Sequence, residues 1–156
     1  MNTVLTSVVA VIGTLIGSWS TYVFQRRTAA RADAANREER LRQERLAAYS
    51  GYAGAVSDLK RALITLWFRR RRLPRDEETL QAAQLDSDRL GAAAETAVFR
   101  LRLVANDPAL RPLTEAISTK LGEIERAADR QALITVEAQF EAAVETFLDA
   151  AGRHLR

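Results

Sequence analysis

The side chains in this sequence that could do the most direct chemistry are four consecutive arginines: Arg69, Arg70, Arg71 and Arg72. Such a cluster could bind phosphate groups, and the rings of the preceding Trp67 and Phe68 could stack on bases beside it. Successive residues of a helix point in different directions, however, so four adjacent arginines do not form one binding face. Cations in the last turn of a helix also oppose the negative end of its dipole. The pattern therefore favours a helix end, with contact to nucleic acid or anionic lipid as the alternative.

Side chains suited to catalysis or metal binding are few. The 156 residues include no Cys and a single histidine, His154, so neither a thiol nucleophile nor a histidine-rich metal site can form. Glu137, Glu141 and Glu145 recur four residues apart, which is typical of one solvated helix face. The sequence has no glycine-rich phosphate loop and no nucleophile elbow. It therefore predicts a protein that is not an enzyme and holds no metal and no cofactor, with His154 in solvent.

Ahead of these residues lies an apolar segment that predicts a transmembrane helix over residues 1–25. The uncharged run Val4–Phe24 would span about 31 Å as a helix, which matches a hydrocarbon core of about 30 Å. A signal peptide and a buried core helix are the alternatives, but a signal peptide carries its positive charges before the apolar run. Here Arg26 and Arg27 follow it. The positive-inside rule therefore predicts an inner (cytoplasmic) membrane protein with its N-terminus outside and the remainder in the cytoplasm.

Small residues in the predicted span favour self-association. Gly13 and Gly17 form a Gly-xxx-Gly pair, and such pairs let two membrane helices approach closely enough for van der Waals contact. Glycine is also common in membrane helices generally, so composition alone is the alternative explanation. On this pattern we expect a homo-oligomer that pairs through Gly13 and Gly17.

Beyond the span, the sequence predicts an all-α protein in which a charged helical stalk leads into a cytoplasmic antiparallel helical bundle. The stalk, residues 26–45, is rich in Ala, Glu and Arg and contains no Pro or Gly. From residue 46 on, apolar residues recur three and four residues apart, as on one face of a helix. The spacing and the helix-end signals predict a bundle over residues 46–156, with helices over about 46–72, 76–105, 109–128 and 130–153.

The same spacing predicts which face of each helix packs. In the first bundle helix the packing face is Tyr52, Val56, Leu59, Leu63 and Leu66. In the second it is Leu80, Ala83, Ser87, Leu90, Ala94, Ala97, Leu101 and Val104. The alanines of the second face predict close approach by a neighbouring helix.

Charge is distributed unevenly behind the formal net charge of +3. Residues 26–75 carry 14 basic and 5 acidic side chains, whereas residues 76–156 carry 9 basic and 15 acidic ones. The acidic balance of the later segment disfavours nucleic acid as its partner and favours a basic protein surface.

Three segments, Ile16–Arg27, Arg42–Tyr49 and Phe99–Pro108, resemble KilB-type proteins. These are small membrane proteins of high-GC actinobacteria, associated in some members with the intramycelial spread of conjugative plasmids. The resemblance implies an architecture and a role in plasmid spread, and it assigns no functional residue to this chain. We interpret the chain as a non-enzymatic, membrane-anchored interaction or scaffold protein that self-associates and presents its bundle to a cytoplasmic protein. The alternatives are a membrane-tethered nucleic-acid or anionic-lipid contact protein that uses Arg69–Arg72, and an accessory regulatory protein that binds a cytoplasmic partner.

Overall fold

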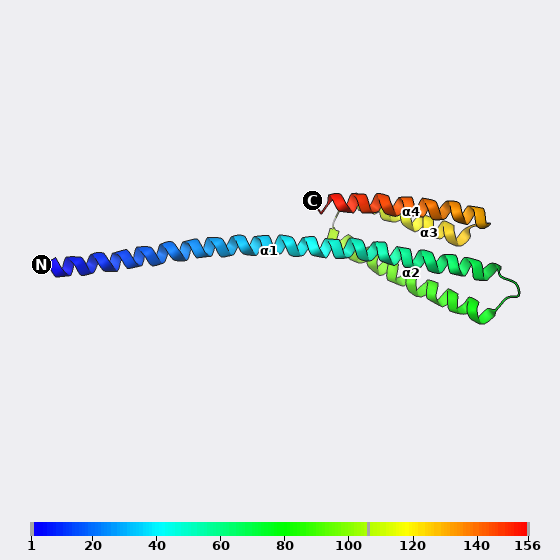
Figure 1. The fold of residues 1–156 in the computed structure, drawn as a ribbon, viewed down its shortest axis with the longest axis horizontal. Helices are drawn as coiled ribbons and strands as arrows, with labels where there is room; N and C mark the ends of the chain where they lie inside the picture. The colour runs from blue at the N-terminus through cyan, green and yellow to red at the C-terminus, as the bar shows by residue number, and fades with distance from the viewer. Residues whose placement is uncertain (1, 106, 156) are drawn as a thin grey trace. The chain divides into compact units, whose positions relative to one another are not determined.

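In the described residues, the computed structural model of the chain has four helices: α1 (Asn2–Arg71), α2 (Glu77–Ala105), α3 (Leu110–Arg126) and α4 (Arg130–Arg153) (Figure 1). The structure describes the backbone of residues 2–105 and 107–155, and the side chains of residues 36–105 and 107–155. The predicted all-α helical bundle is confirmed, as a four-helix bundle. The chain divides into two compact units, Met1–Leu41 and Arg42–Arg156, and the bundle is the second unit.

The predicted membrane span, residues 1–25, and its Gly13 and Gly17 lie outside the residues whose side chains are described. Within the part of the chain whose side chains the structure describes, no helix is both long enough and apolar enough to cross a membrane. The anchor, its orientation and the glycine-mediated pairing therefore stay predictions.

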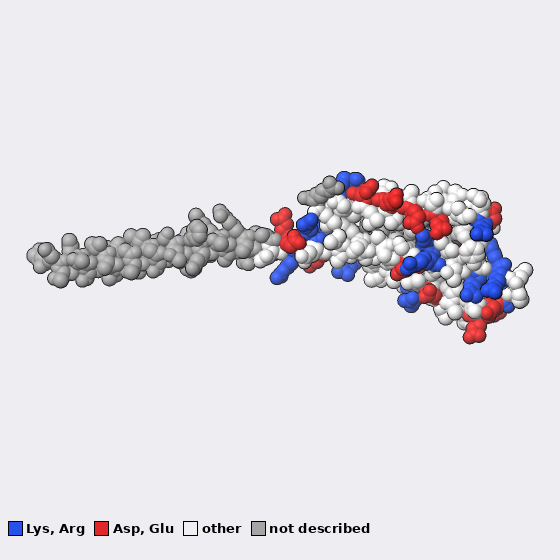
Figure 2. Space-filling view, viewed as in Figure 1, with Lys and Arg blue, Asp and Glu red and all other residues white. Residues whose placement is uncertain are grey.

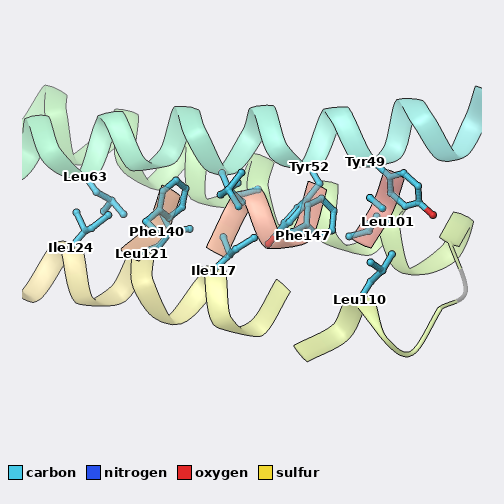
Figure 3. Close-up of a cluster of buried hydrophobic side chains, with 14 of the residues drawn as sticks. Tyr49, Tyr52, Leu63, Leu101, Leu110, Ile117, Leu121, Ile124, Phe140 and Phe147 are labelled. Atoms are coloured by element: carbon cyan, nitrogen blue, oxygen red, sulfur yellow. The ribbon is translucent and has the colours of Figure 1, made fainter. Parts of the chain in front are cut away.

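The part of α1 that belongs to the bundle packs against the other helices through the predicted face. Four of its five residues are buried and Leu59 is half-buried: Tyr52, Val56, Leu63 and Leu66 are at most 7% exposed. Tyr52 is the first residue of this face and lies beside Phe147 in the core (Figure 3). Its ring meets Phe147 of α4 edge-on, with 5.0 Å between centroids, and its hydroxyl donates to the Thr114 carbonyl of α3 at 3.4 Å. Burial of the phenol raises the pKa of Tyr52 well above its ordinary value of 10.0.

Helices α3 and α4 form a hairpin that closes the core against α1 (Figure 3). Their buried apolar residues follow the helical spacing of the sequence: Leu110, Ile117, Leu121, Ile124, Leu133, Phe140, Val144, Phe147, Ala150 and Ala151. The connection is short because Ala127 leaves helical geometry, at φ −53° and ψ 126°, and Asp129 caps α4 by accepting from the Ala132 N–H at 2.8 Å. As a result α3 ends at Arg126, before the predicted end at residue 128.

Helix α2 lies beside α1 (Figure 1). It buries fewer of its residues than α4 does, three among 29 against six among 24. Its three buried residues, Ser87, Ala94 and Leu101, are spaced seven apart on the predicted packing face. Two of them are small, which is consistent with the close approach that the sequence predicts. The remaining members of that face are half-buried, whereas the opposite face of α2 is exposed to solvent.

Candidate functional site

The Arg69–Arg72 cluster lies at the end of α1, and its members turn to different neighbours. Arg70 donates to the Gln84 side chain of α2 at 2.8 Å and to the Glu125 carboxylate of α3 at 3.4 Å. This arginine therefore ties the last turn of α1 to two other helices.

Arg71 is part of a clamp on the connection between α3 and α4. Its guanidinium lies over the ring of Trp67, 3.9 Å from the centroid, and donates to the carbonyls of Ala127 at 2.7 Å and Ala128 at 3.3 Å. The Trp67 indole also donates to the Ala127 carbonyl, at 2.8 Å, and its ring is 5% exposed. At the end of α1, the Arg71 charge therefore lies against the Trp67 ring, and the Ala127 and Ala128 carbonyls are hydrogen-bonded.

Arg69 and Arg72 do not join these contacts. Arg69 is half-buried, and its charge is a minor cause of the lowered pKa of Asp76, which follows mainly from hydrogen bonding by Thr79. Arg72 is exposed beside Leu73. The four arginines therefore do not converge on one point, and the contacts of Arg70 and Arg71 favour the structural interpretation of this cluster over phosphate binding.

The acidic side chains of α4 form a ridge along one face of the bundle (Figure 2). The ridge consists of Glu137, Glu141, Glu145 and Asp149, of which the last three are exposed. Lys60 of α1 neutralises part of it, through ion pairs with Glu137 at 3.5 Å and with Glu141. The sequence predicts a solvated helix face at Glu137, Glu141 and Glu145, and the structure places Lys60 beside the first two of these carboxylates.

His154 is exposed, as the sequence predicts, and it also contacts another segment of the chain. Its Nε2 lies 2.5 Å from Oδ2 of Asp107, in the connection between α2 and α3, although the imidazole is still 43% exposed. Next to it, the Leu155 carbonyl accepts from the Arg42 side chain at 3.1 Å. The end of α4 is therefore fastened to two other segments. In the described residues, no group of three or more His, Asp or Glu side chains could hold a metal ion.

Hollows open between the helices, and two of those in the described residues involve both α2 and α3. One, of about 510 Å³, lies where α2 gives way to α3 and is lined by Leu101, Arg102, Ala105, Asp107, Pro108, Leu110, Arg111 and Thr114. The other, of about 390 Å³, lies between α1, α2 and α3 and has Phe99 and Arg102 at its α2 side. Neither hollow was predicted, because the first is shaped by the turn between α2 and α3 and the second by residues of three packed helices, and local periodicity specifies neither.

Sequence reasoning also missed the exposed face of α2. Three large apolar residues lie there: Leu85 is 62% exposed, Phe99 52% and Leu103 84%. A signal was present, since Ala82, Leu85, Ala92, Phe99 and Leu103 fall on a second three-and-four spacing. That second pattern runs along the same helix as the predicted packing face and was therefore overlooked.

Comparison with protein families finds a match to one family model, described as KilB plasmid transfer protein, over residues 46–155. The matched segment begins near the end of the predicted stalk and covers the bundle. Neither the curated proteins nor the solved structures contain a match to this chain. Because the family model covers well over half of the sequence, the chain belongs to the KilB plasmid transfer protein family.

Proposed function

We propose that this protein is a non-enzymatic, membrane-anchored interaction protein in plasmid transfer. The observation that carries the proposal is the division of the chain: the family domain coincides with the helical bundle, while residues 1–25, which have no charged side chain, lie outside it. In this proposal the uncharged segment is the anchor, and the bundle is held at the cytoplasmic side of the membrane, where it binds other proteins.

The bundle surface supports a protein partner rather than a nucleic acid. The ridge on α4 presents exposed carboxylates at Glu141, Glu145 and Asp149, which repel phosphates and attract a basic protein surface. Among the basic residues, Arg70 and Arg71 of the arginine cluster already donate hydrogen bonds within the protein. The exposed carboxylates of the ridge therefore favour a cationic protein partner on the α4 side.

The anchor is tested by placing charges inside the apolar segment of the full chain. In the variant V9R/I12R two arginines enter the predicted span, each at a cost of about 2.5–3.5 kcal/mol at a helix centre. We expect this variant to leave the carbonate-washed membrane pellet and to lose plasmid spread in the host. The matched control L41R/L46R adds the same charges at apolar positions that are already 52% and 54% exposed, and should remain in the pellet.

Two results would contradict the proposal. One is a V9R/I12R chain that still sediments with washed membranes, which would exclude an anchor in residues 1–25. The other is normal plasmid spread by a chain that has left the membrane, which would separate the anchor from the function.

A further inference from the structure

The exposed face of α2 carries an apolar stripe with the spacing of a coiled-coil seam. We define this α2 stripe by its seven residues: Ala82, Leu85, Arg89, Ala92, Thr96, Phe99 and Leu103. All seven are exposed, and they alternate three and four residues apart over six intervals. On an α-helix they fall within an arc of about 100°, on the side opposite to the buried Ser87, Ala94 and Leu101. Helix α2 therefore has two seams, and the bundle uses one of them.

The stripe differs from scattered surface apolar residues. Isolated exposed leucines are normal on soluble proteins, but exposed apolar residues that recur at heptad spacing along one helix are typical of a contact with another helix. Arg89 is the one charged residue in the stripe, and it is turned toward its own helix by an ion pair with Asp86 at 2.8 Å. Its aliphatic stem can then cover apolar surface while its charge stays at the edge.

We propose that the α2 stripe binds the α2 stripe of a second copy of this chain, with the two helices antiparallel and crossing at the level of residue 94. This inference rests on the interaction role proposed above and adds a partner to it, a second copy of this chain, on a face of the bundle other than the acidic ridge of α4. In this register Leu85 lies opposite Leu103 of the second copy, and Ala92 lies opposite Thr96. Arg89 lies opposite Phe99 of the second copy, where a guanidinium and a ring attract each other.

The charges beside the stripe select this partner and this direction. Exposed acidic residues flank its first half, at Asp86 and Asp88, and exposed arginines flank its second half, at Arg100 and Arg102. An antiparallel second copy brings Asp86 to Arg100 and Asp88 to Arg102, and the two-fold symmetry repeats both pairs. The exposed Glu95 lies near Glu95 of the second copy at the two-fold axis. One repulsion between like charges is therefore set against four attractive pairs.

A parallel arrangement fits the same surface less well. It would place Arg89 against Arg89 of the second copy inside the seam and would lose the four pairs between aspartates and arginines. The helix dipoles would also be aligned rather than opposed.

The absence of cysteine from the chain makes the pairing directly measurable by engineered disulfides. In the full chain, purified in detergent, the double variant L85C/L103C should form a disulfide-linked dimer on mild oxidation. Each single variant should not, because the two positions lie about 27 Å apart along α2 and each faces the other position of the second copy. The same distance prevents a disulfide within one chain. Dimers from the single variants, as a parallel pair would give, would overturn the proposal.

Two substitutions made in the L85C/L103C chain test what holds the pair together. Phe99→Glu should lower the crosslinking rate about tenfold or more, because a charge replaces a central apolar contact in both copies. Ile134→Glu is the matched control on α4, where the side chain is 49% exposed against 52% for Phe99, and it should leave the rate unchanged. An equal effect of the two substitutions would contradict a specific role for the stripe.

A charge reversal tests the direction independently. Asp86→Arg should slow crosslinking about threefold to tenfold, and Arg100→Asp should do the same, because each places like charges together in both symmetric pairs. The double reversal D86R/R100D should restore most of the rate. Failure of this rescue would overturn the antiparallel register.

The same samples separate this inference from the proposed anchor. A chain that sediments with membranes but gives no L85C/L103C dimer would overturn the α2 pairing and leave the anchor standing. A chain that forms the dimer in detergent, and whose V9R/I12R variant still sediments with membranes, would support the pairing while contradicting the anchor.

Discussion

Helices α4 and α2 both flank α1, and they use their apolar residues in opposite ways. Helix α4 buries six residues among its 24, including the rings of Phe140 and Phe147, which have no exposed surface. Helix α2 is longer, at 29 residues, but buries three, and its large side chains at Phe99 and Leu103 face solvent. The difference indicates that the apolar residues of α4 stabilise the bundle, whereas the outer apolar residues of α2 are left for association with another chain.

The largest effect should separate two phenylalanines of these helices. Phe147→Ala removes a fully buried ring that contacts Tyr49 and Tyr52, and it should lower the free energy of unfolding by about 3–5 kcal/mol. Phe99→Ala removes a half-exposed ring, and it should change the stability of the monomer by less than about 1 kcal/mol. Guanidinium unfolding in detergent, followed by Trp67 fluorescence in a Trp19→Phe background, measures both values at a concentration that keeps the chain monomeric.

The same two substitutions also show whether α2 and α4 differ in role. If Phe99→Ala destabilises the monomer as strongly as Phe147→Ala, the outer face of α2 contributes to the fold, and the two helices do not differ in role. If the cost of Phe99→Ala appears only as the protein concentration rises, the side chain acts between chains.

The next effect depends on pH and reports on the contact of α1 with α3 and α4. Burial raises the pKa of Tyr52 above 10.0, and that of Tyr49 is raised for the same main reason. Below pH 10 both states hold the proton, so this stabilisation is fully present. Above pH 10 the unfolded chain ionises while the folded one does not, so stability falls by about 1.36 kcal/mol per pH unit and per group until the folded pKa is reached.

The variant Tyr52→Phe isolates this contribution. It cannot ionise at position 52, so its free energy of unfolding should fall less steeply between pH 10 and pH 11.5 than that of the unsubstituted chain. Equal slopes for the two proteins would show that the Tyr52 phenol is not shielded from solvent and that the α4 side is looser than described.

Local periodicity explains how much of this architecture the sequence could predict. The packing faces of α1 and α2 follow a helical repeat, and every large residue placed on them, from Tyr52 to Leu101, is buried or half-buried. Long-range contacts were beyond such reasoning. His154 meets Asp107, and Arg71 reaches Ala127, because of where the four helices end in space, and no local pattern carries that information.

The α2 stripe shows a different limit of the same reasoning. A helix with two apolar seams gives two valid periodicities, and either one could have faced α1. The seam that packs has no charged residue, and its Ser87 and Ala94 allow close approach to α1, whereas the stripe contains Arg89. Charge, in addition to spacing, therefore distinguishes the inner seam from the outer one.

The smallest effect should distinguish two side-chain contacts made by the end of α1. Arg71→Gln loses the bonds to the Ala127 and Ala128 carbonyls and the stacking on Trp67, and it should lower the free energy of unfolding by about 1–2 kcal/mol. Gln84→Ala loses one contact from Arg70 to α2, and it should cost less than about 0.5 kcal/mol because Arg70 keeps its partner Glu125. The same fluorescence unfolding experiment measures both. Equal costs would mean that the end of α1 holds α2 as firmly as it holds the α3–α4 connection. The difference in burial between α2 and α4 would then not extend to this end of the bundle.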